Sequence, residues 1–154
     1  MAIRRNKDVK AWLWRYRDAV REYRRLSDEY RQLTEGQEGP KAIRYDKGTV
    51  PVGGGNDADL SSLMATREKL ERKAADANSE MLYTLAERLE AIDALPTCAM
   101  REVISMRYIQ LSDGKAAKWE DIADRMSYSM QRVFEIHGQA LDRLSEVLRN
   151  RKTR

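Results

Sequence analysis

Cys98 and His137 are the side chains with the clearest capacity for chemistry, as a nucleophile and as a proton carrier or metal ligand. Each is the only residue of its type, and the two lie far apart along the chain. A thiol near a helix start can have a lowered pKa, but no paired His motif accompanies this one. The sequence therefore predicts an ordinary packed thiol at Cys98, and packing or a buried hydrogen bond at His137.

A run of three glycines at 53–55 is another feature that could bind a ligand, because glycine-rich loops cradle phosphates. No strand pattern precedes the run, and no Lys-Ser or Lys-Thr pair follows it. A flexible connector is therefore favoured. Carboxylates are plentiful, but their spacing places them on solvated helix faces. We predict a protein that is not an enzyme and has no catalytic residues, no metal site and no cofactor.

Charge is distributed unevenly along the 154 residues, whose formal net charge is +4. Residues 1–35 carry +4, residues 58–95 carry −3 and residues 96–154 carry +3. The basic end holds Arg149, Arg151 and Lys152, which could contact phosphates, although a solvated tail is the favoured interpretation. A single cysteine fits the reducing cytoplasm. No apolar run is long enough to predict a membrane span.

Two long helices are predicted, joined by a Gly- and Pro-rich linker over 36–57. The first covers 1–35 and the second covers 58–95, where Pro96 ends it. Heptad spacing gives the first a seam of Val9, Trp12, Tyr16, Ala19, Tyr23, Leu26, Tyr30 and Leu33. The second has Leu60, Leu63, Leu70, Ala74, Ala77, Met81, Leu82, Leu85, Leu89 and Ile92. Opposite charges favour a long antiparallel coiled-coil hairpin, and dimerisation through the same stripes stays open.

The C-terminal region, 96–154, is predicted to hold three shorter helices. They cover about 98–111, 119–126 and 130–149, with a turn at 127–129. A short helix, a three-residue turn and a second amphipathic helix are typical of a helix-turn-helix module. The inner face of the last helix is Val133, Ile136 or His137, Ala140, Leu141, Leu144 and Leu148. The predicted fold class is therefore all-α.

Residues 95–144 resemble region 4 of the sigma-70 family. The similarity runs in order through 95–96 (Leu-Pro), 101–108 (Arg-Glu-Val-Ile-Ser-Met-Arg-Tyr), 119–126 (Trp-Glu-Asp-Ile-Ala-Asp-Arg-Met), the turn 127–129, Val133 and 140–141 (Ala-Leu). The whole layout also resembles small phage or prophage regulators, whose modules end in a Val-x-x-x-His-Gly-x-Ala-Leu pattern, here 133–141. The loop at 112–118 is longer than usual in the family, and Lys118 stands where Ser or Thr often caps.

The resemblance implies a DNA-binding transcription regulator in the cytoplasm of a bacterial host. Its contacts with double-stranded DNA at a promoter-like site would come from Ser129, Met130, Gln131, Arg132, Phe134 and Glu135. Gln131 can read adenine, Glu135 can accept from cytosine, and Arg132 can take a phosphate. Met130 and Phe134 could contact a thymine methyl or be covered by another subunit. Contact with RNA polymerase stays open, as do two alternatives: a small terminase-like DNA-packaging subunit, and a polymerase-docking adaptor that does not bind DNA.

Overall fold

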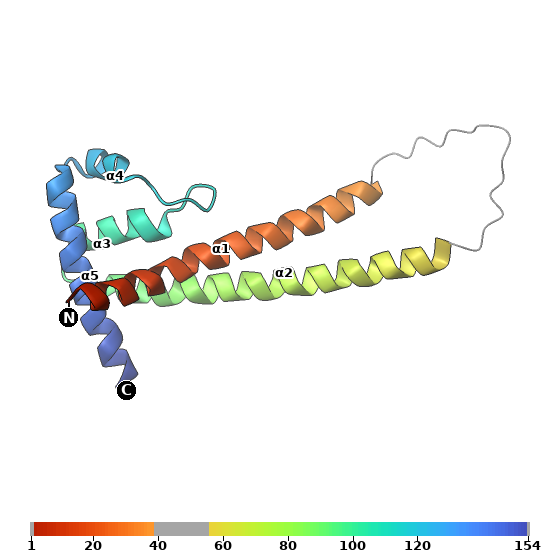
Figure 1. Cartoon of the computed structure of the whole chain (residues 1–154), viewed down its shortest axis with the longest axis horizontal. Helices are drawn as coiled ribbons and strands as arrows, with labels where there is room; N and C mark the ends of the chain where they lie inside the picture. Colours follow the sequence, from red (N-terminus) through yellow and green to blue (C-terminus); the bar gives the residue numbers. More distant parts are fainter. Residues whose placement is uncertain (1, 39–55, 154) are drawn as a thin grey trace. The chain divides into compact units, whose positions relative to one another are not determined.

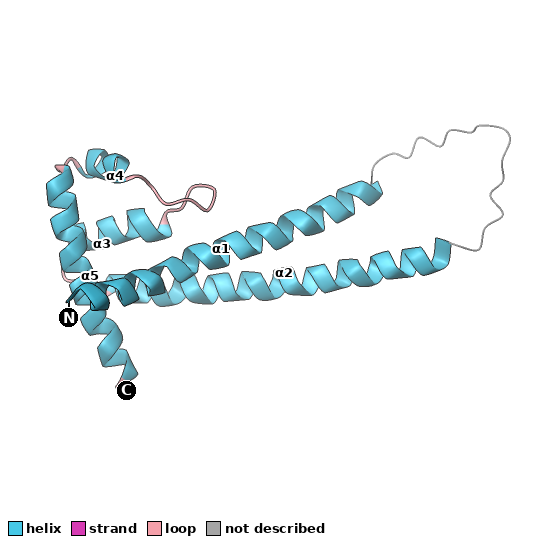
Figure 2. Cartoon of the chain, viewed as in Figure 1, coloured by secondary structure: helices cyan, strands magenta, loops and turns pink. Residues whose placement is uncertain are grey.

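The computed structural model describes residues 2–38 and 56–153, with the side chains of 6–35 and 59–153. Its elements are α1 (Ala2–Glu38), α2 (Asn56–Asp93), α3 (Cys98–Ile104), the π-helical turn η1 (Ser105–Ile109), α4 (Trp119–Met126) and α5 (Met130–Lys152). Figure 1 labels the five α-helices, and Figure 2 shows that helices and loops make up the described part of the chain. The all-α prediction is confirmed. Most of the predicted linker, at 39–55, lies outside the described residues.

The chain divides into two compact units, each of which contains part of α1 and part of α2. The larger unit is Met1–Arg21 with Ser79–Arg154, and the smaller unit is Glu22–Asn78. Both long helices are close to their predicted limits. However, α1 continues through Gly36 to Glu38, so the predicted end at Glu35 is early. One glycine weakens a helix by only about 1 kcal/mol and need not end it.

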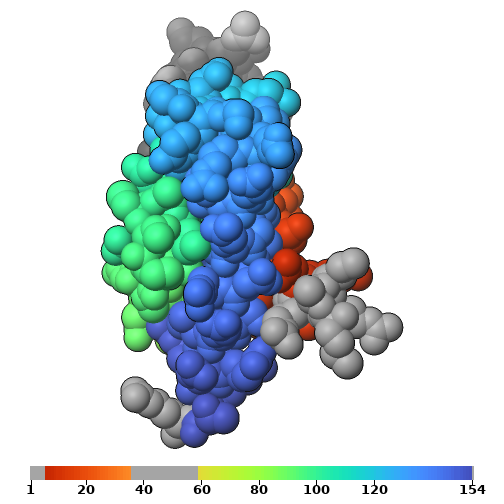
Figure 3. All heavy atoms as spheres, turned by 90° about the vertical axis from the view of Figure 1, so that its left-hand side faces the viewer, coloured from red at the N-terminus to blue at the C-terminus, as the bar shows by residue number. Residues whose placement is uncertain are grey.

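The core of the larger unit is formed by residues from both ends of the sequence. Figure 3 shows α5 in blue across the near face, with green segments of the same unit on one side and the start of α1 in red on the other. The buried apolar residues are Val9, Leu13, Ala91, Ile92, Leu95, Met100, Val103, Ile104, Tyr108, Ile122, Ala123, Val133, Ile136, Ala140, Leu141 and Leu144. Leu13 is fully buried, although the predicted seam omits it. The first turns of α1 therefore belong to the same core as the C-terminal helices.

The predicted seam of α2 is wrong for four of its leucines. Leu60 and Leu63 are 55% and 43% exposed, and Leu82 and Leu89 are 53% and 42% exposed. The buried face near the end of α2 instead carries Thr84, Arg88, Ala91 and Ile92. A count of apolar residues misses this face, because one of its central residues is an arginine.

Arg88 is buried, with 2% of its surface exposed, and it joins α2 to α1. Its Nη2 donates to the Trp12 carbonyl at 2.6 Å, and its Nη1 donates to the Thr84 carbonyl at 3.2 Å. The guanidinium carbon lies 4.1 Å from the centroid of a Trp12 ring. Burial lowers the pKa of Arg88, and the Glu87 carboxylate, 2.8 Å away, opposes that shift. The side chain therefore packs like an apolar residue while its donors are satisfied.

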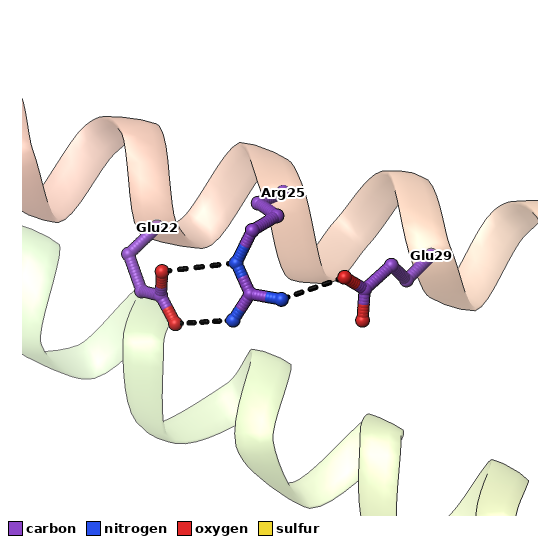
Figure 4. Close-up of polar contacts among 3 residues, drawn as sticks. All are labelled: Glu22, Arg25 and Glu29. Carbon is purple, nitrogen blue, oxygen red and sulfur yellow. Dashed lines mark hydrogen bonds and ion pairs between the residues drawn. The ribbon is translucent and has the colours of Figure 1, made fainter.

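The smaller unit has Leu26 as a buried apolar residue on α1. On the exposed surface of the same helix, Arg25 donates to Glu22 and to Glu29, each at 2.6 Å (Figure 4). These contacts raise the pKa of Arg25, and the hydrogen bond from Arg25 lowers the pKa of Glu22. Exposed ion pairs contribute little to global stability. This network therefore supports α1 locally.

We predict that Arg88→Ala lowers the free energy of unfolding by about 3 kcal/mol, because it removes buried charge-assisted hydrogen bonds and a cation–π contact. Denaturant unfolding followed by circular dichroism measures the change. Arg72→Ala is the matched control, because Arg72 is an exposed arginine of the same helix, and its effect should be below about 0.5 kcal/mol. Equal effects from the two variants would contradict the role given to Arg88.

Candidate nucleic-acid interface

A three-residue turn joins α4 to α5, and local signals explain its geometry. Ser127 ends α4 in the left-handed region, with φ of 56° and ψ of 38°. The Tyr128 amide then donates to the Ala123 carbonyl at 3.0 Å. Ser129 caps α5, because its hydroxyl accepts from the Arg132 amide at 3.2 Å. The predicted limits of α4, the turn at 127–129 and the cap at Ser129 are confirmed.

The first two turns of α5 have an inner and an outer face. Val133 and Ile136 are buried, whereas Gln131, Arg132 and Glu135 are exposed. The guanidinium of Arg132 lies 3.3 Å from the Glu135 carboxylate, and both side chains are about half exposed. An exposed pair of this kind is weak. Both groups can therefore exchange their partner for a ligand at little cost.

Met130 and Phe134, the two apolar side chains of the predicted site, differ in their surroundings. Met130 is partly buried and packs against the core. Phe134 remains 47% exposed and meets the ring of Trp119, the first residue of α4, edge-on at 5.2 Å. One side of Phe134 therefore braces α4 against α5, and the rest is available for a contact.

A buried hydrogen bond between Tyr108 and His137 connects η1 to α5. The Tyr108 hydroxyl lies 2.9 Å from Nε2 of His137, as the buried-hydrogen-bond prediction for His137 requires. Burial raises the pKa of Tyr108 to about 12. Burial lowers the pKa of His137 to about 4, helped by the positive charges of Lys10 and Arg107. The imidazole is therefore neutral at pH 7.

Aromatic and cationic side chains extend this pair in both directions. Trp14 of α1 packs on Tyr108 with ring centroids 4.5 Å apart, and Trp119 meets His137 edge-on at 4.8 Å. The Arg107 guanidinium lies 4.6 Å from Trp119 and 5.5 Å from Trp14, and it also donates to the Ala117 carbonyl. We call Trp14, Tyr108, His137 and Trp119 the aromatic column. Sequence reasoning missed the role of Trp14. One feature of the sequence could have indicated this role. Trp14 is an aromatic residue that lies outside the heptad seam, three positions before Arg17.

The structure separates the predicted site residues into two groups. Arg149, Arg151 and Lys152 lie in the last turn of α5, about 30 Å from Ser129 at 1.5 Å per residue. Arg151 pairs with Glu90 of α2 at 3.2 Å. These three cations therefore lie at the end of α5, far from the predicted contacts at its start, and one of them pairs with α2 of the same unit.

Cys98 is exposed, so the prediction of a packed thiol is wrong. The residue occupies the first position of α3, directly after the Thr97 cap. The first buried core residue of α3 is Met100, two residues later.

Within 2–38 and 56–153, no group of three or more His, Cys, Asp or Glu side chains could hold a metal ion. No helix among the same residues combines the length and apolarity needed to cross a membrane. The chain matches no family model, no curated protein and no solved structure. The resemblance to sigma region 4 thus depends on the residues themselves.

The free energy of unfolding should fall by about 2 kcal/mol between pH 7 and pH 5, because His137 binds a proton more readily when unfolded. Its unfolded pKa is about 6.5, and its folded pKa is about 4. The contribution of the neutral imidazole is complete above the unfolded value and decreases as the pH falls toward the folded one. Denaturant titrations at several pH values measure the slope.

His137→Gln is the control for this slope, because glutamine keeps a polar partner for Tyr108 but does not titrate. His137 is the only histidine in the chain, so the variant should have a nearly flat profile between pH 7 and pH 5.5. The same slope in both proteins would show that other groups cause it.

Proposed function

We propose that this protein is a sequence-specific DNA-binding transcription regulator. In this proposal α4, the turn and α5 form a helix-turn-helix whose second helix enters the major groove. The observation that carries it is the exposed polar face at the start of α5, held outward by a buried inner face. The resemblance to sigma region 4 and to phage or prophage regulators supports the same assignment, with a cytoplasmic location in a bacterial host and RNA polymerase as a further partner.

The side chains on this face suit base and backbone contacts. Gln131 and Glu135 are four residues apart and share one side of α5. An amide can bond the adenine edge, and a carboxylate can accept from cytosine. Arg132 can contact a phosphate once it leaves Glu135. The N-terminus of a helix also favours anions through its backbone dipole. The proposed reading head is therefore Ser129, Gln131, Arg132 and Glu135.

We also propose that α1 and α2 pair as an antiparallel coiled coil. Two interactions in the smaller unit support this orientation. Arg67 lies over Tyr30, 5.9 Å from its ring centroid, and Lys73 acts electrostatically on Glu22. Residue numbers fall along α2 as they rise along α1, as antiparallel helices require.

A polymerase-docking adaptor is the second candidate. It is favoured by the apolar side chains beside the polar face, because Tyr128 is 44% exposed and Phe134 is 47% exposed. Aromatic side chains of this kind are common anchors in protein interfaces. The adaptor and the DNA-binding regulator differ in whether the chain alone selects a DNA sequence.

Selection of bound sequences from random double-stranded DNA tests the proposal. The wild-type chain should recover a short motif, and Gln131→Ala and Glu135→Ala should each relax the preference at one or two positions. The expected loss of discrimination is about 1–3 kcal/mol at the affected base pair. Arg132→Ala should weaken binding to all sequences, with a log–log salt slope shallower by about 0.9.

The same helix offers matched controls. Glu146 pairs with Arg143 at 3.3 Å in the same i,i+3 geometry as Glu135 with Arg132, so Glu146→Ala should leave the motif unchanged. Gln139→Ala is the matched control for Gln131→Ala, because Gln139 is also an exposed glutamine on α5. Recovery of no motif, or of one unchanged by the two test substitutions, would reject DNA reading by this face and favour the adaptor.

A further inference from the structure

Four residues near the start of α5 share its outer face. They follow the i, i+3, i+4, i+7 spacing of one helical stripe and are Gln131, Phe134, Glu135 and Gly138. The first three are exposed, and Gly138 is partly exposed. Phe134 is the only large apolar side chain among them. An apolar ring therefore lies between the amide of Gln131 and the carboxylate of Glu135, within the face to which we assign base contacts.

The ring of Phe134 is held in place by the start of α4. Trp119 meets it edge-on at 5.2 Å, and Trp119 is itself in contact with the His137 ring and the Arg107 guanidinium. Phe134 nevertheless remains 47% exposed. A side chain whose orientation is already fixed loses little conformational entropy when it binds a ligand. Phe134 is therefore a preorganised apolar contact, whereas the neighbouring Met130 packs against the core.

Gly138 leaves this ring uncovered. A helical side chain leans over the turn before it, so a side chain at position 138 would lie over Phe134 and Glu135. Glycine weakens a helix interior, and its backbone here does not adopt a positive φ. A Cβ at Gly138 would have no atom of the described chain within 4 Å, apart from its own helix backbone and adjoining residues. Packing within the chain therefore does not require the glycine, and the space beside Phe134 is open to a ligand group.

We propose that Phe134 reads the methyl group of a thymine, in the space that Gly138 leaves open. The proposal rests on the proposed function, because it concerns which bases the same face selects. The thymine methyl is an apolar group among the hydrogen-bonding base edges of the major groove. That arrangement matches an apolar ring between an amide and a carboxylate.

Helix spacing indicates where this thymine lies. Residues three apart on a helix have Cβ atoms about 5–6 Å apart, and neighbouring base pairs are about 3.4 Å apart along the duplex. Phe134 follows Gln131 by three residues. The thymine should therefore lie within about two base pairs of the adenine that Gln131 reads.

A protein partner matches this ring less well than DNA does. Aromatic anchors in protein interfaces fill well-packed pockets, surrounded by contacts that exclude water. A pocket that enclosed Phe134 would also take the Glu135 carboxylate out of water, and burying a charge is costly unless it is paired. In the major groove, a cytosine amino group can supply that partner beside the thymine methyl.

Replacement of thymine by uracil tests the contact, because it removes the methyl group and keeps the hydrogen-bonding groups of the base. Each thymine of the recovered motif is replaced by deoxyuridine in turn, and binding of the full-length chain is measured by fluorescence anisotropy. For the wild type, one replacement should weaken binding about fourfold, the effect of one buried methyl group. That position should lie within about two base pairs of the one that Gln131→Ala relaxes.

Phe134→Ala should lower this ratio of thymine to uracil affinity from about four to about one. The ratio is measured within one protein, so a general loss of affinity from a displaced α4 cancels. Tyr128→Ala is the matched control, because Tyr128 is an aromatic residue of similar exposure, 44% against 47%, in the turn before α5. This control should keep the fourfold ratio.

Gly138→Leu separates stability from recognition. Leucine favours a helix more than glycine does and would pack on Phe134, so the denaturant midpoint of unfolding should rise. The thymine-to-uracil ratio should nevertheless fall to about one, because the ring is covered. A more stable variant that keeps the fourfold ratio would overturn the use of this space.

The outcomes distinguish this inference from the proposal on which it rests. Recovery of no motif would overturn both. A motif that binds equally well with uracil at every thymine, or a ratio that Phe134→Ala leaves unchanged, would overturn this inference alone.

Discussion

The buried hydrogen bond between Tyr108 and His137 determines how α5 is rotated about its axis. Both groups are buried, so each would lose its solvation without the other, and an unpaired buried polar group costs about 1–3 kcal/mol. One residue corresponds to about 100° of helix rotation. Any register that moved His137 outward would therefore also bring Gln131 and Glu135 toward the core. The outward direction of the proposed reading head follows from a contact farther along the same helix.

The aromatic column extends this constraint to α1. Trp14 covers one side of Tyr108, and Leu13 beside it is fully buried in the same core. Residues from the first turns of the chain thus complete the core beneath α5. A fragment that began at Pro96 would retain α4, the turn and α5 but would remove Trp14 from the ring of Tyr108. The region that resembles sigma region 4 is therefore not structurally independent of the N-terminal helix.

Sequence reasoning succeeded where the determinants are local and failed where they are not. The limits of α4 and the start of α5 were predictable, because the Ser127–Ser129 turn and the Ser129 cap depend on neighbouring residues. The inner face of α5 was predictable from apolar spacing. The buried face of α2 was not, because Arg88 is buried through a contact with Trp12, 76 positions away along the chain. The same limit applies to Trp14, whose place on Tyr108 leaves no trace in heptad spacing.

The polarity of α2 near its end is the reverse of what a lone amphipathic helix would have. Arg88 lies inside, where its donors are satisfied by Trp12 and Thr84, and Leu82 and Leu89 lie outside. Exposure of half of each leucine gives up part of the stabilisation, about 1.5–3 kcal/mol, that full burial of such a side chain provides. Moving these leucines to the inner face would displace Arg88 and remove its hydrogen bond to the Trp12 carbonyl and its contact with the Trp12 ring. The contact between Arg88 and Trp12 therefore sets which face of α2 is buried within its own unit.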